Sequence, residues 1–375
     1  MEKRIIQPEE FDDFLRGLVI YGTGGGGDED WGRLLLNNDL KRGRVCEIVD
    51  PKDVADDAFI CSGGLMGSVK SLEGMSYEDI TMGWEENFPL TTAIQTMETI
   101  MNKKVDYIIP FEVGALNTTV MMTAAARLGI PMIDGDLIGR STPETHMTAP
   151  IGNGVNLYPM PLLDRHGNTT IVMHSDSPTY ADEVGRFVVV KGGGLGANAH
   201  YPMTGKQLKE AIVPNTVTRA VEFGRVIAAA NAAKEDPVEA FRQEVDGDLL
   251  FDGVITEMSG EDKGGFYLTN LVMEGKGPFA GKKLKMIVKN ESMIIWIDEK
   301  LSIMLPDCAF MLDPATGAGI PSIAHKVGLN MAIVGADCHP RVSKCMESEV
   351  GRIAFGADRY GCPGLPYVPY SQLKG

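Results

Sequence analysis

The sequence has no long apolar run and no apolar stretch near its start. Its longest apolar runs, such as Ala309–Leu312 and Met293–Ile297, fall far short of the roughly 20 residues that a membrane-spanning helix needs. Residues 1–10 contain neither the apolar core nor the small-residue cleavage site of a secretory signal. We therefore expect a cytoplasmic protein that does not bind a membrane.

Paired cysteines and an excess of basic residues are also missing. None of the six cysteines has the CxxC spacing of a metal or redox site, and their scatter is typical of free thiols in a reducing compartment. The formal net charge is −16, and no cluster of Lys and Arg reverses it locally. Such a chain repels phosphate backbones, so we expect no nucleic-acid partner.

What is present is the pattern of a two-part α/β protein. In residues 1–165, short β-rich runs alternate with helical periodicity, which predicts a parallel-sheet α/β domain. The predicted helices there begin near Pro89 and Leu116. The predicted strands are 18–21, 44–49, 58–61, 105–109 and 131–133.

The second domain is predicted to cover residues 166–375. A hairpin of strands 156–159 and 169–174 leads into it, and Asn215 is suited to cap a helix that runs to about Ala233. From about residue 246 apolar runs alternate with Gly, Asn and Asp turns, which predicts a β-rich α+β domain.

The first candidate site is the glycine run between Gly22 and Asp28, which follows the predicted strand 18–21. Glycines there let backbone N–H groups approach a carboxylate, a phosphate or a ring carbonyl at a helix N-terminus. The predicted substrate-binding glycines are Gly24, Gly25, Gly26 and Gly27. The run also fits the dinucleotide pattern GxGxxG, but four consecutive glycines match many patterns by chance, so we expect no nucleotide cofactor. A tight turn without a ligand is the remaining interpretation.

The second candidate site follows the predicted strand 105–109. Glu112 and Asn117 would lie just beyond its carboxyl end, the edge at which open α/β sheets usually bind ligands. A carboxylate there can serve as a general base, and Asn117 can contact a substrate. Helix capping and solvation at the helix terminus are the alternative.

The third candidate site is the polar segment 131–146, which begins as a strand and then carries closely spaced ionisable side chains. Two nearby carboxylates suit a shared proton or a hard cation, and an arginine can grip a substrate carboxylate. The residues concerned are Asp134, Asp136, Arg140, Glu144 and His146, of which Asp134, Asp136 and Glu144 are predicted, with Glu112, to be catalytic. Asp134, Asp136 and His146 are the predicted ligands of a divalent metal, zinc or manganese. A plain surface turn is the alternative.

Taken together, these segments resemble one family, the S-methyl-thiohydantoin desulfurase-like proteins. The motif of residues 134–144 is specific, and the resemblance spans nearly the whole chain. His146 stands where the family usually has Gln, and Glu112–Asn117 departs from the family's Glu-x-Gly-Gly-x-Asn. The segments that carry the resemblance are 22–28, 112–117, 134–144, 201–208, 311–317 and 355–358.

The resemblance implies hydrolytic removal of sulfur from a thiohydantoin-type ring, with a divalent metal as a possible aid. On this hypothesis Asp136 or Glu112 activates water for attack on the ring carbon that bears sulfur. Arg140 and the Gly24–Gly27 loop then hold the ring or its carboxylate tail. The expected substrate is a small molecule, and the expected assembly is a homo-oligomer.

Two other classes of function remain open. The first is a non-catalytic subunit that binds a hydantoinase or oxoprolinase-type partner, in which the acidic cluster is structural. The second is a nicotinamide-dependent oxidoreductase.

Overall fold

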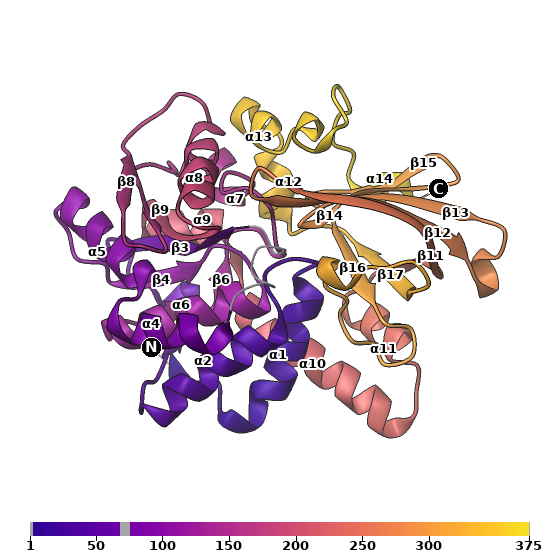
Figure 1. Ribbon diagram of the computed structural model, residues 1–375, viewed down its shortest axis with the longest axis horizontal. Helices are drawn as coiled ribbons and strands as arrows, with labels where there is room; N and C mark the ends of the chain where they lie inside the picture. The colour runs from indigo at the N-terminus through magenta and orange to yellow at the C-terminus, as the bar shows by residue number, and fades with distance from the viewer. Residues whose placement is uncertain (1–2, 68–75, 375) are drawn as a thin grey trace.

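A computed structural model describes residues 3–67 and 76–374, which form two β-sheets with helices around them (Figure 1). The first sheet is formed by strands within residues 3–204, and the second sheet by strands within residues 248–336. The predicted fold class, an α/β part followed by a strand-rich part, is confirmed.

The first sheet is mixed. Its strands β2, β5, β4 and β3 are parallel, whereas β1, β9, β7 and β8 are paired antiparallel to their neighbours. In spatial order the strands are β1 (Lys3–Arg4), β2 (Ile48–Val49), β5 (Met132–Ile133), β4 (Tyr107–Pro110), β3 (Phe59–Gly67), β9 (Leu195–Thr204), β7 (Met160–Asp164) and β8 (Thr169–Val172).

The central strands of this sheet are buried on both faces. Successive residues of β4 point to opposite sides, so that Ile108 packs into the core beneath α1 and α6 while Ile109 packs into the core on the other face. Burial on both faces explains why these strands read as continuous apolar runs. The helices around the sheet are α1 (Phe11–Tyr21), α2 (Glu29–Lys41), α4 (Tyr77–Glu86), α5 (Pro89–Met101), α6 (Ala115–Leu128), α7 (Ala149–Gly152), α8 (Tyr180–Lys191), α9 (Gly205–Ala211) and α10 (Thr216–Ala233).

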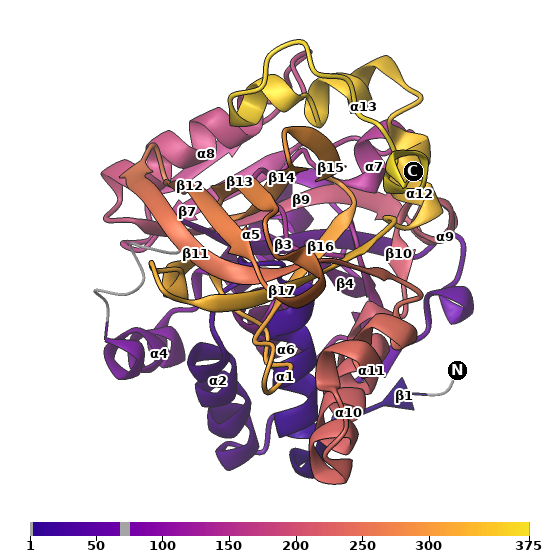
Figure 2. The same ribbon diagram turned by 90° about the vertical axis from the view of Figure 1, so that its right-hand side faces the viewer.

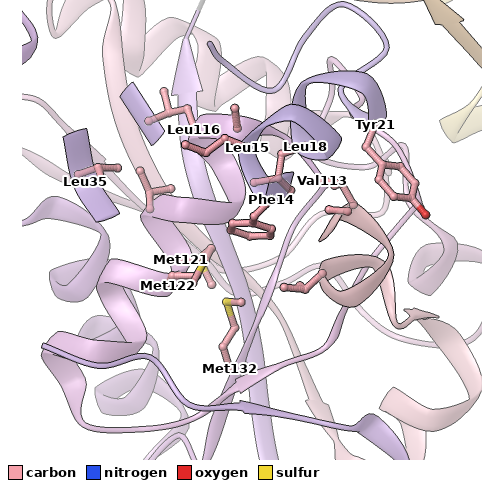
Figure 3. Close-up of a cluster of buried hydrophobic side chains, with 14 of the residues drawn as sticks. Phe14, Leu15, Leu18, Tyr21, Leu35, Val113, Leu116, Met121, Met122 and Met132 are labelled. Carbon is pink, nitrogen blue, oxygen red and sulfur yellow. The ribbon is translucent and has the colours of Figure 1, made fainter. Parts of the chain in front are cut away.

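Helix α1 corrects a sequence prediction. Residues 18–21 were expected to form a strand, but they are the last turn of α1, because Phe14, Leu15 and Leu18 fall on one helical face and are buried (Figure 3). A Cβ on Gly17 would lie 1.7 Å from the Ala220 carbonyl oxygen of α10, so only glycine allows these two helices to cross so closely.

The second sheet is antiparallel throughout and faces the viewer in Figure 2. Its order is β15 (Lys300–Met304), β14 (Glu291–Ile297), β13 (Lys283–Lys289), β12 (Phe266–Gly275), β11 (Asp248–Lys263), β17 (Asn330–Ala336) and β16 (Cys308–Leu312). Short helices accompany it: α11 (Pro237–Glu244), α12 (Pro340–Cys345), α13 (Glu349–Ala354) and α14 (Tyr370–Leu373). A separate two-stranded sheet joins β6 (Gly135–Asp136) to β10 (Val213–Pro214).

The first sheet continues past residue 165, where the sequence predicts a domain boundary. The β7–β8 hairpin lies on both sides of that residue, and β9 pairs with β3 in the middle of the sheet. The first strand of the hairpin is 160–164 instead of 156–159. Within the described ranges, no helix combines the length and the apolar character that crossing a bilayer requires.

Candidate active site

A small cavity lies where the two sheets meet. Its volume is about 60 Å³, which corresponds to room for roughly four or five water-sized groups. The lining residues come from β3, β9 and α8, from the segments after β4 and β6, from the glycine run, and from the β13–β14 turn. The polar lining side chains are Glu112, Asn117, Thr142, Thr145, Arg186, Asn198, His200, Asn290 and Glu291.

Glu112 lies between the carboxyl end of β4 and the start of α6, as its position in the sequence predicts. Its carboxyl group is buried and accepts hydrogen bonds from the Asn117 side-chain amide and, at 2.5 Å, from the Thr142 N–H. Burial raises the pKa of Glu112 to about 7, although these hydrogen bonds and the positive charges of Arg186 and Arg140 oppose the shift. The group can therefore gain or lose a proton near neutral pH.

A second carboxyl group, that of Glu291, lines the same cavity and was not predicted. It begins β14, and its oxygen Oε1 lies only 1.7 Å from where a Cβ on Gly25 would stand. Burial, followed by the negative charge of Glu112, raises the pKa of Glu291 well above its ordinary value. Burial therefore favours the neutral, protonated form of Glu291. The sequence gives no signal for it, because a polar hairpin turn is normally exposed, whereas this one is buried against the first sheet.

Three buried polar atoms of the cavity wall have no hydrogen-bond partner among the described residues. They are Thr142 Oγ1, His200 Nδ1 and Glu291 Oε2. Burial lowers the pKa of His200 to about 3, so its ring is neutral. Since an unsatisfied buried polar group costs about 1–3 kcal/mol, these atoms are placed for a ligand that offers hydrogen bonds.

The glycine run contributes to this wall, but its surroundings differ from the prediction. It follows α1, not a strand. Gly26 and Gly27 line the cavity, and Gly25 makes room for Glu291. The Gly26 carbonyl accepts hydrogen bonds from Leu116 N–H and Asn117 N–H. These two N–H groups belong to the first turn of α6, so they are already paired within the protein. The carbonyl of Gly24 accepts from Ser322 N–H and ties the run to the C-terminal half.

Asp134 and Asp136 do not line the cavity. Asp134 accepts hydrogen bonds from Val217 N–H, Thr218 N–H and the Thr218 hydroxyl, so it caps α10, where Asn215 was expected to act. Asp136 accepts from the N–H groups of Ile138 and Gly139 within its own turn. The two carboxyl groups that flank Gly135 therefore serve two separate structural contacts, one at the start of α10 and one within the turn after β6.

Arg140 is also structural, although a grip on the substrate was predicted for it. Its guanidinium group is buried and donates to the backbone carbonyls of Ser141, Ser292 and Asp307 at 2.6–3.0 Å. Ser292 lies in β14 of the second sheet and Asp307 directly precedes β16, so Arg140 joins the acidic segment to the second sheet.

Glu144 and His146 belong to a buried charge cluster beside the cavity. Glu144 pairs with Lys289 at 2.6 Å and with Arg359, and His146 Nε2 lies 3.7 Å from the same carboxyl group. The predicted metal ligands Asp134, Asp136 and His146 thus have separate surroundings. In residues 3–67 and 76–374, no three His, Cys, Asp or Glu side chains are grouped so that they could hold a metal ion.

The raised pKa of Glu112 predicts a pH-dependent change in stability. Because the pKa rises from 4.5 to about 7 on folding, the stability contribution of this group is full below pH 4.5 and is lost as the pH rises through 7. Glu112→Gln can keep both hydrogen bonds if the Asn117 amide rotates. Relative to wild type, the variant should gain about 2–3 kcal/mol between pH 5 and pH 8, measured by urea unfolding. A difference that does not change with pH would contradict this.

Comparisons with known proteins agree with the resemblance in the sequence. The model of the S-Me-THD-like N-terminal domain matches residues 9–174, and that of the S-Me-THD-like C-terminal domain matches residues 176–370. A crystal structure of a protein from Chromobacterium violaceum aligns with a TM-score of 0.76 at 22% identity, over 98% of this chain and 100% of that one, which shows a shared fold. No curated protein matches the chain. The chain therefore belongs to the S-Me-THD-like family, with which a role of the thiohydantoin desulfurase type is consistent.

Proposed function

We propose that the protein hydrolyses a small thiohydantoin-type ring at the carbon that bears sulfur, releasing a thiol. The observation that carries the proposal is Glu112, a buried carboxyl group with a pKa of about 7 on the wall of a small cavity. A general base works best when its pKa is near the working pH, and burial is the usual means of raising the pKa of a glutamate that far. Membership of the S-Me-THD-like family supports the choice of ring.

The wall of the cavity offers the kinds of contact that an uncharged ring can make. Thr142 Oγ1 and His200 Nδ1 have no partner in the described part of the chain and can bind ring N–H or carbonyl groups. Phe111, Leu65 and Leu116 supply apolar wall. The guanidinium of Arg186 already donates to the backbone carbonyls of Gly67, Pro143 and Gly265, which leaves little capacity for a substrate carboxylate.

In the proposed reaction, the Glu112 carboxylate takes a proton from a water molecule, whose oxygen bonds to the ring carbon. The C–S bond then breaks, the carbon becomes a carbonyl, and the sulfur leaves as a thiol. One water is consumed for each thiol released. The hydrogen bonds from Asn117 and Thr142 fix the orientation of the Glu112 carboxylate for this proton transfer.

The direct test is turnover of an S-methyl thiohydantoin in water labelled with ¹⁸O. We expect thiol release, measured with a chromogenic disulfide, and one ¹⁸O atom in the ring product, measured by mass spectrometry. Asp136→Asn is a matched control, because it also changes a buried carboxyl to an amide but at a residue that does not line the cavity, and it should keep turnover within threefold. Absence of thiol release, or a ring product without the label, would refute the proposal.

A further inference from the structure

The cavity holds one carboxyl group more than water activation requires. Glu291 comes from the second sheet, whereas Glu112 comes from the first, and both line the cavity. Glu291 is only 2% exposed, and its Oε2 has no partner within the described ranges. Its other oxygen, Oε1, lies against Gly25, and no residue other than glycine would leave space for it at that position. The glycine run therefore packs against Glu291 and fixes the position of its side chain at the cavity wall.

We infer that Glu291 is the proton donor to the departing sulfur, a role that rests on the proposed hydrolysis of a thiohydantoin-type ring. An alkyl thiolate is a poor leaving group unless it receives a proton as the C–S bond breaks. The donor must be a neutral acid in the cavity, with a free oxygen that can reach the substrate. Glu291 meets these conditions with Oε2.

The protonation states of the two acids support this division of roles. The pKa of Glu112 is about 7, and the pKa of Glu291 is raised well above its ordinary value, by burial and by the charge of Glu112. Burial and the charge of an ionised Glu112 both favour the protonated form of Glu291, whereas Glu112 exchanges its proton near neutral pH. Other charged or titratable groups at the cavity are Arg186, which is positive, and His200, whose low pKa of about 3 keeps it neutral.

The proton balance closes over one turnover. Glu112 takes a proton from water and passes it to the ring nitrogen as the C–O bond forms. When the C–S bond breaks, the new hydroxyl group gives its proton to Glu112 and becomes the carbonyl, while the sulfur takes the proton of Glu291. Transfer of one proton from Glu112 to Glu291 after product release restores both acids.

The test is the dependence of the rate on the leaving group. S-methyl and S-aryl thiohydantoins with the same ring are compared in wild type, in Glu291→Gln and in Glu274→Gln, a control at an exposed carboxyl of the same sheet. An aryl thiolate leaves without a proton. Glu291→Gln should therefore lose at least a hundredfold in kcat on the S-methyl ring but less than fivefold on the S-aryl ring, and Glu274→Gln should match wild type on both.

Each result is decisive. Equal losses on the two substrates would overturn the assignment of Glu291 and leave the hydrolysis standing. No turnover of either ring by wild type would overturn the hydrolysis and, with it, the assignment. If Glu291→Gln does not fold, the comparison of the two rings in wild type is the test. A kcat on the S-aryl ring within tenfold of that on the S-methyl ring supports proton donation, and a larger excess on the S-aryl ring refutes it.

Discussion

Glu112→Gln should lower kcat/KM for an S-methyl thiohydantoin by a factor on the order of a thousand, because general-base catalysis contributes roughly 10² to 10⁴ in rate. The amide keeps the shape of the side chain and its hydrogen bonds to Asn117 and Thr142, but it cannot accept the proton of water. The fold should be retained, and the variant should bind the ring with KM within about tenfold of wild type. Steady-state kinetics of thiol release measure both quantities.

The pH profile gives an independent check on the same residue. Since the base acts only when ionised, wild-type kcat/KM should fall tenfold per unit below a pKa of about 7. The residual rate of Glu112→Gln should lack this acid limb. If Asp136→Asn, and not Glu112→Gln, removed turnover and the limb, Asp136 would be the base and the present assignment would be wrong.

Arg140→Lys should cost about 3 kcal/mol or more of folding free energy. The guanidinium group serves three backbone carbonyls in different directions, whereas an ammonium on a flexible stem cannot reach all three. Each buried carbonyl left without a partner costs about 1–3 kcal/mol. The variant should show a lower urea midpoint and reduced soluble yield.

The matched control for this change is Arg225→Lys. Arg225 is 54% exposed and pairs with Glu10 at the surface, so the substitution should change stability by less than about 0.5 kcal/mol. In the folded fraction of Arg140→Lys, KM should remain within threefold of wild type, because the side chain does not line the cavity. A hundredfold rise in KM without loss of stability would instead show that Arg140 grips the substrate.

Much of the first sheet and its helices could be predicted from local pattern. Helix α5 buries one face and α6 is buried on nearly all sides. Both begin at or beside the expected residues, Pro89 and Leu116, and Pro89 favours a helix start because its backbone φ angle is fixed. The strand 18–21 was predicted wrongly, since a short apolar run fits a buried strand and a buried helix equally well. The sheet partner β9 was not found, because its Gly- and Ala-rich sequence has weak strand propensity.

Glu112 and Asn117 were predicted from one local rule, that ligands bind just after the carboxyl end of a parallel strand. The structure places both residues at the cavity. The segment 131–146 was the densest polar motif, yet its side chains act mainly as structure: Asp134 caps a helix, Asp136 closes its own turn and Arg140 joins the two halves. Spacing along the chain brings such groups near one another but does not set the direction in which each side chain points.

The sequence by itself determined the fold class, the acidic character of the surface and one carboxyl group at a sheet edge, because each follows from composition or from contacts within a few residues. Only the tertiary structure decided which groups share the cavity. Glu291 and His200 lie far from Glu112 along the chain. His200 reaches the cavity because β9 pairs with β3, and Glu291 reaches it because the β13–β14 turn is buried against the first sheet. The same burial removes water from both carboxyl groups, and this is the physical reason why their pKa values rise.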